Sequence, residues 1–443
     1  MKKIILTLVL TAQAALMAHA GGIMTNTNYH IAFDRMMARG ATFDIDAVFS
    51  NPAGLAWGYE GWQMSLNFQK PWQYRDITLT GTNGSQLYRG KASAPIVPAL
   101  FASYRKDRLA VSAMLGIVGS GGFVKYSDGV PMFNQLMAGL LYQNGITPDT
   151  YGIDSEMKGK QYIYGGQLNL TYRLTDHLSG AVGMRVNYYD GYYRGHVVAG
   201  GHQQLGELAK LLLDVDQKGW GFTPIVSAAY HQGPLTLTAR YEFRTKIATT
   251  NDTNVLEAGL GQNVVAALAQ QPGGMERLQA LAGNLATYTA PYEDGAETRY
   301  DMPALLSLAV GYEFTPQLRA TLEYHWFDDT HAKMANNRQK ELRHGTHEVL
   351  AGVEYDINKK FTVSAGAQHT DYGLSDNYQQ NTSFACDSWS IGLGGAWNIT
   401  EKVRLNAGYF ISLYTDYDKA ATYGLETYSR TNNVIGVGVD FKF

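Results

Sequence analysis

The side chains best suited to chemistry in this sequence are histidines near carboxylates, and their spacing argues against an active site. The chain has eleven histidines, and none forms a His-x-x-x-His pair with an acidic partner that would suit a metal ion. Glu323 and His325 are separated by one residue, and His344 and His347 lie close together. The simplest interpretation makes the first two interior residues and the second two loop residues. We expect no enzymatic activity, no metal and no cofactor.

The composition excludes further classes of protein. A single cysteine, Cys386, cannot form an internal disulfide, so an exported chain must be stabilised in another way. The formal net charge is −3, which offers no basic field for nucleic acid. Forty-eight glycines, thirty tyrosines and only 17% charged residues suit strands and aromatic girdles better than a helical enzyme.

The first twenty residues have the order of a secretory signal peptide. Lys2 and Lys3 precede an apolar run over 4–17, and Ala-His-Ala follows at 18–20. The run is too short for a membrane helix, which needs about twenty apolar residues. The pattern predicts export and cleavage after Ala20.

The elements that must position the rest are short segments of alternating character. In the first, Trp62, Met64, Leu66 and Phe68 share one face and polar residues share the other. Fourteen such segments follow one another from residue 60, and their connections alternate between turn-sized and long. We therefore predict an all-β fold over 60–443, a 14-stranded antiparallel transmembrane β-barrel.

This architecture predicts a location and several partners. An even strand number with sorted connections places the barrel in a bacterial outer membrane, in contact with lipopolysaccharide and with both termini in the periplasm. The chain ends on Phe443 with Phe441 on the same face, which resembles the recognition signal of the barrel-assembly machinery. We expect a monomer with no nucleic-acid partner.

Some of the long connections have apolar residues at helical spacing, over 132–142, 205–213, 254–269 and 275–286. The clearest stripe is Leu256, Leu260, Val264 and Leu268. One interpretation is that these extracellular helices pack together and cap the barrel. The other is that the stripe faces outward and captures a ligand, since exposed apolar patches often mark binding sites.

Residues 21–59 precede the first strand and lack its alternation, so we predict an N-terminal hatch that plugs the barrel. A free periplasmic tail would be polar, whereas this stretch is rich in apolar side chains. Five of them are candidates for lining a ligand pocket: Ile23, Met24, Phe33, Met36 and Met37.

The same stretch carries a family resemblance. Several motifs resemble the hatch of the FadL/TodX family of outer-membrane transporters for hydrophobic compounds and long-chain fatty acids: Arg39-Gly40-Ala41, Asp44, Asp46-Ala47 and Asn51-Pro52-Ala53-Gly54-Leu55. Asn-Pro alone is only a turn signal, but here it follows a signal peptide and precedes fourteen strands. The segment between Gly40 and Asn51 is shorter than in the fatty-acid members, and the mature N-terminus lacks their aromatic residue.

The resemblance implies a mechanism of passive uptake. A hydrophobic molecule would be captured by the loops, enter a lumenal pocket, shift the hatch and leave sideways through a gap at a kink in the third strand. Here the third strand leads into Gly116, Gly119, Gly121 and Gly122, which could form such a gate. They could equally be ordinary loop glycines.

Two other functions compete with transport of a hydrophobic compound. A general diffusion porin should have opposed acidic and basic rows in its lumen and an N-terminus that enters the first strand directly. A surface receptor or adhesin would use its long loops for binding.

Overall fold

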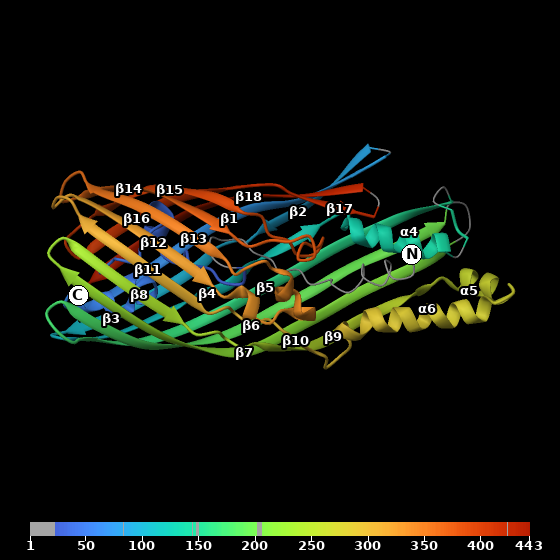
Figure 1. Ribbon diagram of the computed structural model, residues 1–443, viewed down its shortest axis with the longest axis horizontal. Helices are drawn as coiled ribbons and strands as arrows, with labels where there is room; N and C mark the ends of the chain where they lie inside the picture. The colour runs from blue at the N-terminus through green and yellow to red at the C-terminus, as the bar shows by residue number, and fades with distance from the viewer. Residues whose placement is uncertain (1–22, 83, 144, 148–149, 202–205, 423) are drawn as a thin grey trace.

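The computed structural model describes residues 23–443 except 83, 144, 148–149, 202–205 and 423, so the predicted signal peptide lies outside the described residues. The strands form one antiparallel sheet that closes on itself where β1 (Gly61–Gly81) pairs with β18 (Gly424–Lys442). Closure satisfies the backbone hydrogen bonds that lipid cannot provide. Figure 1 shows the resulting barrel from the side.

Between these two strands run sixteen further segments: β2 (Gly84–Ser93), β3 (Val97–Lys106), β4 (Leu109–Tyr126), β5 (Tyr151–Arg173), β6 (Leu178–Gly201), β7 (Glu207–Gln232), β8 (Leu235–Glu242), β9 (Ala248–Leu260), β10 (Glu297–Arg299), β11 (Leu305–Glu313), β12 (Leu318–Phe327), β13 (His347–Asp356), β14 (Phe361–Asp371), β15 (Ser388–Asn398), β16 (Val403–Tyr414) and β17 (Tyr417–Ala421). Four barrel strands are each broken into two segments, namely β2 with β3, β8 with β9, β10 with β11 and β16 with β17. The barrel thus has fourteen strands, and the predicted fold is confirmed.

The two faces of the wall differ as the alternation predicted. Trp62 and Phe68 are 55% and 45% exposed toward the lipid side, whereas Ser65 and Asn67 between them are buried toward the interior. The C-terminal residue Phe443 lies at the end of the barrel where the short turns gather (Figure 1).

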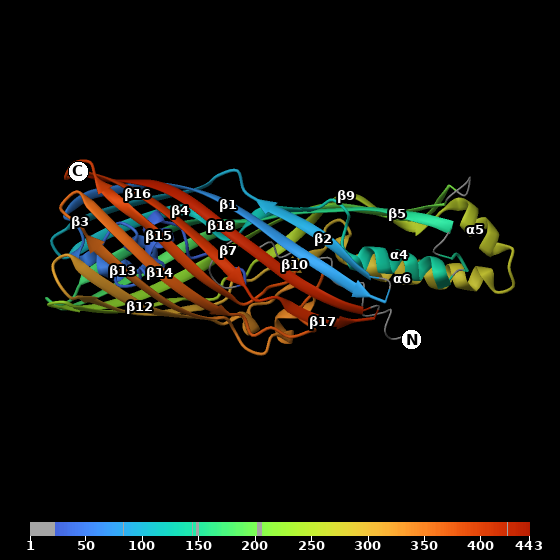
Figure 2. The ribbon, with the colours of Figure 1, turned by 90° about the horizontal axis from the view of Figure 1, so that it is seen from above.

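The wall is much taller on one side than on the other. Strands β5, β6 and β7 have 23, 24 and 26 residues, whereas β11 has 9 and β12 has 10. The tall side carries α4 (Pro131–Gln143), α5 (Gln262–Ala269) and α6 (Gly274–Thr289) at the end away from the short turns (Figure 2). Among the described residues, no helix has the length and apolar character needed to cross a membrane.

Two of the predicted loop helices are wrong in part or entirely. Leu256 and Leu260 lie on strand β9, so only Val264 and Leu268 of the predicted stripe are helical, in α5. The stretch 205–213 is likewise not helical from residue 207 onward, where it begins β7. The cause is tertiary: β7 and β9 pair from Trp220 opposite Ala248 to Ala209 opposite Leu260, and this ladder outweighs local helical spacing.

The segment before β1 lies inside the barrel. It contains α2 (Ile31–Met36), α3 (Ala47–Ser50) and the 3-10 helix η1 (Pro52–Trp57). Helix α2 contacts β13 to β16, β18 and β1, α3 contacts β3 and β4, and η1 contacts β4 to β7. The segment therefore touches most of the circumference of the wall.

A row of inward-facing glycines makes room for α2. Gly352 pairs with Gly366, which pairs with Gly392, on three neighbouring strands. A Cβ atom at Gly366 would lie 1.8 Å from the carbonyl oxygen of Met36, and one at Gly392 would lie 2.5 Å from that of Asp34. Only glycine allows the helix backbone to approach the wall this closely. We call this row, with Gly394, Gly408, Gly436 and Gly438, the glycine bed.

The glycine bed generates a first prediction. Replacing Gly366→Ala should push α2 away from the wall and lower stability by about 1–3 kcal/mol, the usual cost of overpacking, while the strands still assemble. The measurement is the temperature at which the folded barrel loses its heat-dependent mobility shift on SDS gels. Gly259→Ala on β9 is the matched control, because a Cβ there has open space around it. Equal melting temperatures for the two variants would contradict the steric role of the bed.

Candidate functional site

The Arg39 motif holds the turn after α2 together. The guanidinium of Arg39 donates to both carboxylate oxygens of Asp46, at 2.6 and 2.9 Å, and to Asp44 at 3.1 Å. The carboxylate of Glu323 on β12 accepts the backbone N–H groups of Arg39 and Gly40, at 3.0 and 2.8 Å. Gly40 is needed at this position because a Cβ would lie 2.6 Å from that of Ala309. Gly40, Asp44 and Asp46 thus form one locally bonded unit that is attached to the wall.

The Asn-Pro-Ala motif docks on another part of the wall. Asn51 accepts the N–H of Gly54 at 3.3 Å and caps η1, with Pro52 at the first helical position. The carbonyl oxygens of Pro52 and Ala53 accept hydroxyl groups from Thr171 on β5, at 2.8 Å, and from Ser179 on β6, at 2.7 Å. The motif therefore combines a local cap with attachment to two strands.

Between these contacts, Phe49 is held by buried charge. Its ring lies under the guanidinium groups of Arg185 and Arg240, at 5.3 and 4.4 Å, and its carbonyl oxygen accepts a hydrogen bond from Arg240. Arg185 pairs with Glu242 through two hydrogen bonds of 2.8 Å. Bidentate pairing of this kind makes the ion pair rigid as well as strong.

The wall itself is interrupted on the strand formed by β2 and β3. The ladder between β3 and β4 ends at the pair Leu100–Leu115, and the ladder between β2 and β4 resumes at Ser93–Phe123. The stretches 94–99 and 116–122 face each other between these points. Pro95 and Pro98 lie in the first stretch and lack the backbone N–H that a ladder needs. We call this interruption the wall gap.

Strand β4 is also irregular along its other edge, where it pairs with β5. The register of β4 against β5 shifts between Ile117 and Gly119 and again between Ser120 and Gly122. Two bulges within six residues bend a strand and leave residues unpaired. The four glycines predicted as a gate, Gly116, Gly119, Gly121 and Gly122, all lie in this distorted part of β4.

The chain before α2 seals the wall gap. Asn26 donates its backbone N–H to the carbonyl oxygen of Val118 and its side-chain amide to that of Ile117, both at 3.1 Å. The hydroxyl of Tyr29 donates to Val118 at 3.0 Å. A Cβ at Gly119 would lie 2.5 Å from the Met24 carbonyl oxygen, so the segment lies directly against the strand. The carbonyl groups of Ile117 and Val118, in the stretch where the ladder is broken, are thus satisfied from inside.

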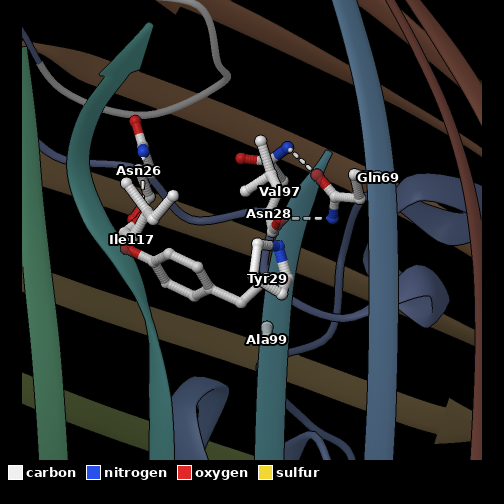
Figure 3. Close-up of a pocket in the computed structure, with 8 residues that line it drawn as sticks. Asn26, Asn28, Tyr29, Gln69, Val97, Ala99 and Ile117 are labelled. Atoms are coloured by element: carbon white, nitrogen blue, oxygen red, sulfur yellow. Dashed lines mark hydrogen bonds between the residues drawn. The ribbon is translucent and has the colours of Figure 1, made fainter. Parts of the chain in front are cut away.

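A small pocket lies at this seal. Figure 3 shows Asn26, Asn28 and Tyr29 from the N-terminal segment together with residues of β1, β3 and β4. The residues that line it are Asn26, Asn28, Tyr29, Gln69, Val97, Pro98, Ala99 and Ile117. Asn28 and Gln69 are joined by hydrogen bonds of 3.0 and 2.6 Å, which tie the segment to β1 as well.

The five residues predicted to line a ligand pocket do not come together. Ile23 and Met24 belong to an apolar cluster with Tyr29 and Phe101, whereas Phe33 and Met37 pack against Leu350, Phe410 and Val434. Met36 lies on the glycine bed. The residues that line the pocket were missed by the sequence analysis, although two prolines between alternating segments were a signal of a broken strand.

Two loops fold inward at the opposite end from the short turns. The loop 328–346 contains η4 (Asp329–His331) and η5 (Ala335–Glu341), and it meets the loop 372–387. Arg338 donates to the hydroxyls of Tyr378 and Ser383, at 3.0 and 2.8 Å. Loop 372–387 carries the buried Cys386, whose pKa burial raises to about 12. This thiol is therefore unreactive near neutral pH.

The predicted capture helix has its apolar side turned inward. Val264 and Leu268 of α5 are 8% and 2% exposed and pack in a cluster with Leu208 and the α4 residue Met137. In the part of the chain that the structure describes, no group of three or more His, Cys, Asp and Glu residues could hold a metal ion.

The fold and the family match define the class. The family model of the outer membrane protein β-barrel domain matches residues 258–443, which is less than half of the chain. With the closed 14-stranded sheet, this match identifies an outer-membrane β-barrel and places the protein in the outer membrane, as predicted. No curated protein sequence matches the chain.

The solved structures that resemble it are more specific. A Pseudomonas aeruginosa FadL homologue superposes with a TM-score of 0.67 at 15% identity, over 96% of this chain and 100% of the other. The Pseudomonas putida toluene transporter TodX superposes with a TM-score of 0.58 at 14% identity, over 97% of this chain and 100% of the other. The Ralstonia pickettii toluene transporter TbuX superposes with a TM-score of 0.53 at 14% identity, over 90% of this chain and 94% of the other. The chain has the FadL-type fold.

The inward loops generate a pH prediction. Burial raises the pKa of Asp329 to about 6, although the carboxylate accepts the N–H of Thr346 at 2.9 Å and faces that of Ile23. A raised pKa means that the folded loop prefers the protonated acid, so this stability is complete below the ordinary pKa near 3.8 and is lost as pH rises through about 6.

We therefore expect the melting temperature in detergent to fall as pH rises from about 4 to about 7, and the free energy of unfolding to fall with it by an amount on the order of 2 kcal/mol. Asp329→Asn should flatten that dependence, as measured by melting curves across this pH range. Glu341→Gln is the control, because Glu341 lies in the same loop 328–346 and is exposed. An unchanged slope in Asp329→Asn would show that other groups cause the dependence.

Proposed function

We propose that the protein is a passive outer-membrane transporter of hydrophobic compounds, which enter from the loops and leave sideways through the wall gap. The observation that carries this proposal is the interrupted ladder at 94–99 and 116–122, sealed by Asn26 and Tyr29. An outer-membrane barrel has no need of such an interruption for stability, since an unbroken ladder would satisfy more backbone groups.

A lateral exit suits a hydrophobic cargo. The free energy of an apolar molecule falls when it leaves water, by about 25 cal/mol per Å² of buried apolar surface. An aqueous pore through the barrel would offer them no favourable environment. A gap in the wall leads directly into the hydrocarbon region, where such a molecule is soluble.

Within this proposal the chain has three functional parts. Residues 1–20 are the signal peptide, 21–59 are the hatch and 60–443 are the barrel. The hatch seals the gap with residues 23–30, while the Arg39 and Asn51 motifs anchor its remainder to the wall. The seal can therefore move without release of the whole plug.

The cargo is proposed to be a long-chain fatty acid or a similar lipophilic molecule. The fold neighbours include a FadL homologue and toluene transporters. The cargo to be considered therefore ranges from acidic lipids to small neutral hydrocarbons. The apolar cluster below α4 and α5 supports entry of a long apolar chain from the loop end.

Tethering the seal tests the lateral route. In a Cys386→Ser background, the pair Asn26→Cys and Ile117→Cys joins two residues that line the same pocket and are hydrogen bonded at 3.1 Å. The oxidised protein should lose uptake of a labelled hydrophobic compound by cells, and reduction should restore it. Thiol titration verifies that the disulfide has formed.

Two controls make this result specific. Each single cysteine variant should transport at the same rate under oxidising and reducing conditions. The pair Asn28→Cys and Gln69→Cys tethers the same segment to β1 beside the gap and separates movement of the segment from opening of the wall. Normal uptake through the oxidised Asn26–Ile117 tether would rule out the gap as the exit.

The hatch motif gives a separate prediction. Asn51→Ala removes the cap of η1, worth about 1 kcal/mol, and should reduce uptake several-fold while barrel assembly, seen as heat-dependent gel mobility, is unchanged. Ser50→Ala is the neighbouring control. Uptake at the wild-type rate in Asn51→Ala would remove the motif from the mechanism.

Conductance distinguishes the competing classes. A general diffusion porin would show a steady open current in a planar bilayer, whereas a barrel plugged by residues 23–59 should conduct little. A receptor or adhesin would bind its partner without any uptake of hydrophobic compounds.

A further inference from the structure

The lipid-facing surface of β11 to β14 contains an apolar hollow of about 630 Å³. Outward-facing alanines on three of these strands leave it open, and they lie in two cross-strand rows. In one row Ala351 pairs with Ala367, and in the other Ala320 and Ala365 lie on either side of Val353. A single methyl group projects far less than the large apolar side chains that cover the rest of this surface, so the wall is recessed here. We call this recess the outer groove.

Larger side chains and bare backbone give the outer groove its shape. Val310 and Tyr312 of β11 stand at the ends of the two rows and form one side wall. The floor includes Gly352 and Gly366, which belong to the glycine bed and have α2 on their inner face. At these two positions only strand backbone separates α2 from the groove. The groove is therefore a defined depression in the wall and not merely a run of small side chains.

The depth of the outer groove places it in one leaflet. Phe314, which lines the groove, comes directly before the short turn 315–317, and short turns lie on the periplasmic side of an outer-membrane barrel. From Ala365 to the turn residue Lys360 the distance is about 17 Å along a tilted strand. One leaflet contributes about 15 Å of hydrocarbon. The groove therefore lies at the depth of the acyl chains of the periplasmic leaflet, and the turn lies at the depth of its head groups.

Two exposed lysines lie at the periplasmic end of the strands that form the outer groove. Lys359 and Lys360 belong to the turn between β13 and β14, where Asn358 accepts the backbone N–H of Lys360 at 2.8 Å and fixes the turn. Among the described residues neither ammonium group has an ion-pair partner, and Asp356 beside the turn is bound to Arg319 at 2.7 Å. Adjacent cations at head-group depth attract anionic lipid.

We propose that the outer groove binds an acyl chain of a glycerophospholipid from the periplasmic leaflet, whose phosphate is held by Lys359 and Lys360. This site goes beyond the proposed transport function and does not depend on it. The hydrophobic effect contributes little to such binding, because the surrounding lipid is as apolar as the wall. Retention of the lipid depends instead on close packing of the chain in the groove and on attraction between the phosphate and the two ammonium groups.

The test compares two lipids with identical acyl chains on the full-length barrel in non-ionic detergent, with binding measured by native mass spectrometry. Dipalmitoylphosphatidylglycerol carries the phosphate, and dipalmitoylglycerol lacks it. Ala365→Leu fills the outer groove and should weaken binding of both lipids several-fold. The double variant Lys359→Gln, Lys360→Gln should weaken binding of the phosphatidylglycerol about tenfold or more and leave that of dipalmitoylglycerol unchanged.

Two control variants test whether these effects belong to the outer groove. Ala407→Leu is matched to Ala365→Leu, because Ala407 is also the fifth residue of an upward strand, faces outward and does not line the groove. Lys106→Gln removes an exposed lysine from the short turn between β3 and β4. Both controls should bind the two lipids as the wild type does, and heat-dependent gel mobility verifies folding of every variant.

Three results would overturn the lipid site. The first is unchanged lipid binding in Ala365→Leu, or an equal loss in Ala407→Leu. The second is retention of lipid A, the anchor of lipopolysaccharide, in place of the phosphatidylglycerol, which would contradict the periplasmic leaflet. The third is conversion of a dimer into a monomer by Ala365→Leu in light scattering, with lipid binding unchanged, which would make the outer groove an interface with a second copy of the chain.

Discussion

Backbone hydrogen bonding inside a lipid layer is the constraint on which the structure depends. Lipid offers no partners, so every N–H and C=O at membrane depth must be satisfied within the protein. Closure of β1 on β18 meets this requirement around nearly the whole wall. At the wall gap the wall fails to meet it, and Asn26 and Tyr29 supply the missing partners to Ile117 and Val118. The gap and its seal are therefore one unit: opening exposes carbonyl groups, so the sealed state is favoured until a ligand or water replaces those bonds.

The two sides of the hatch are held by different physics, and this difference decides which part can move. On one side α2 lies on the glycine bed, where backbone approaches backbone and a shift would lose close packing over its whole length. On the other side residues 23–30 are held by individual hydrogen bonds, each worth about 1 kcal/mol net, and by the apolar packing of Ile23, Met24 and Tyr29. Such bonds can be exchanged one at a time. In the proposed transport function, the N-terminal stretch is therefore the part that moves, and the helix and the Arg39 and Asn51 motifs are its anchor.

The fold could be predicted because alternation with period two, as in Trp62 to Phe68, is a local property of the sequence. The loop helices could be predicted only where the chain has no partner strand. Helices α4 and α6 formed as expected, whereas Leu256 and Leu260 lie on β9 because this segment pairs with β7. The glycines of β4 pointed to the right region, but the seal required knowledge of where residues 23–30 run. The pairing of β1 with β18 joins the first strand to the last, and no local pattern reports that register.

The distribution of polar and apolar residues inside the barrel favours a path along one wall. Buried charges in the interior are tightly bonded, such as Arg185 with Glu242 and Arg35 with Glu354, and an apolar molecule could not displace them without leaving charges unpaired. Two apolar clusters also lie in the interior. One lies below α4 and α5 and includes Tyr126 and Phe384, and the other includes Met24 and Tyr29 at the wall gap. Tyr417 packs against both clusters. In the proposed transport function, a ligand that enters from the loops would therefore remain in apolar surroundings until it reaches the seal, and the buried ion pairs would hold the plug in place.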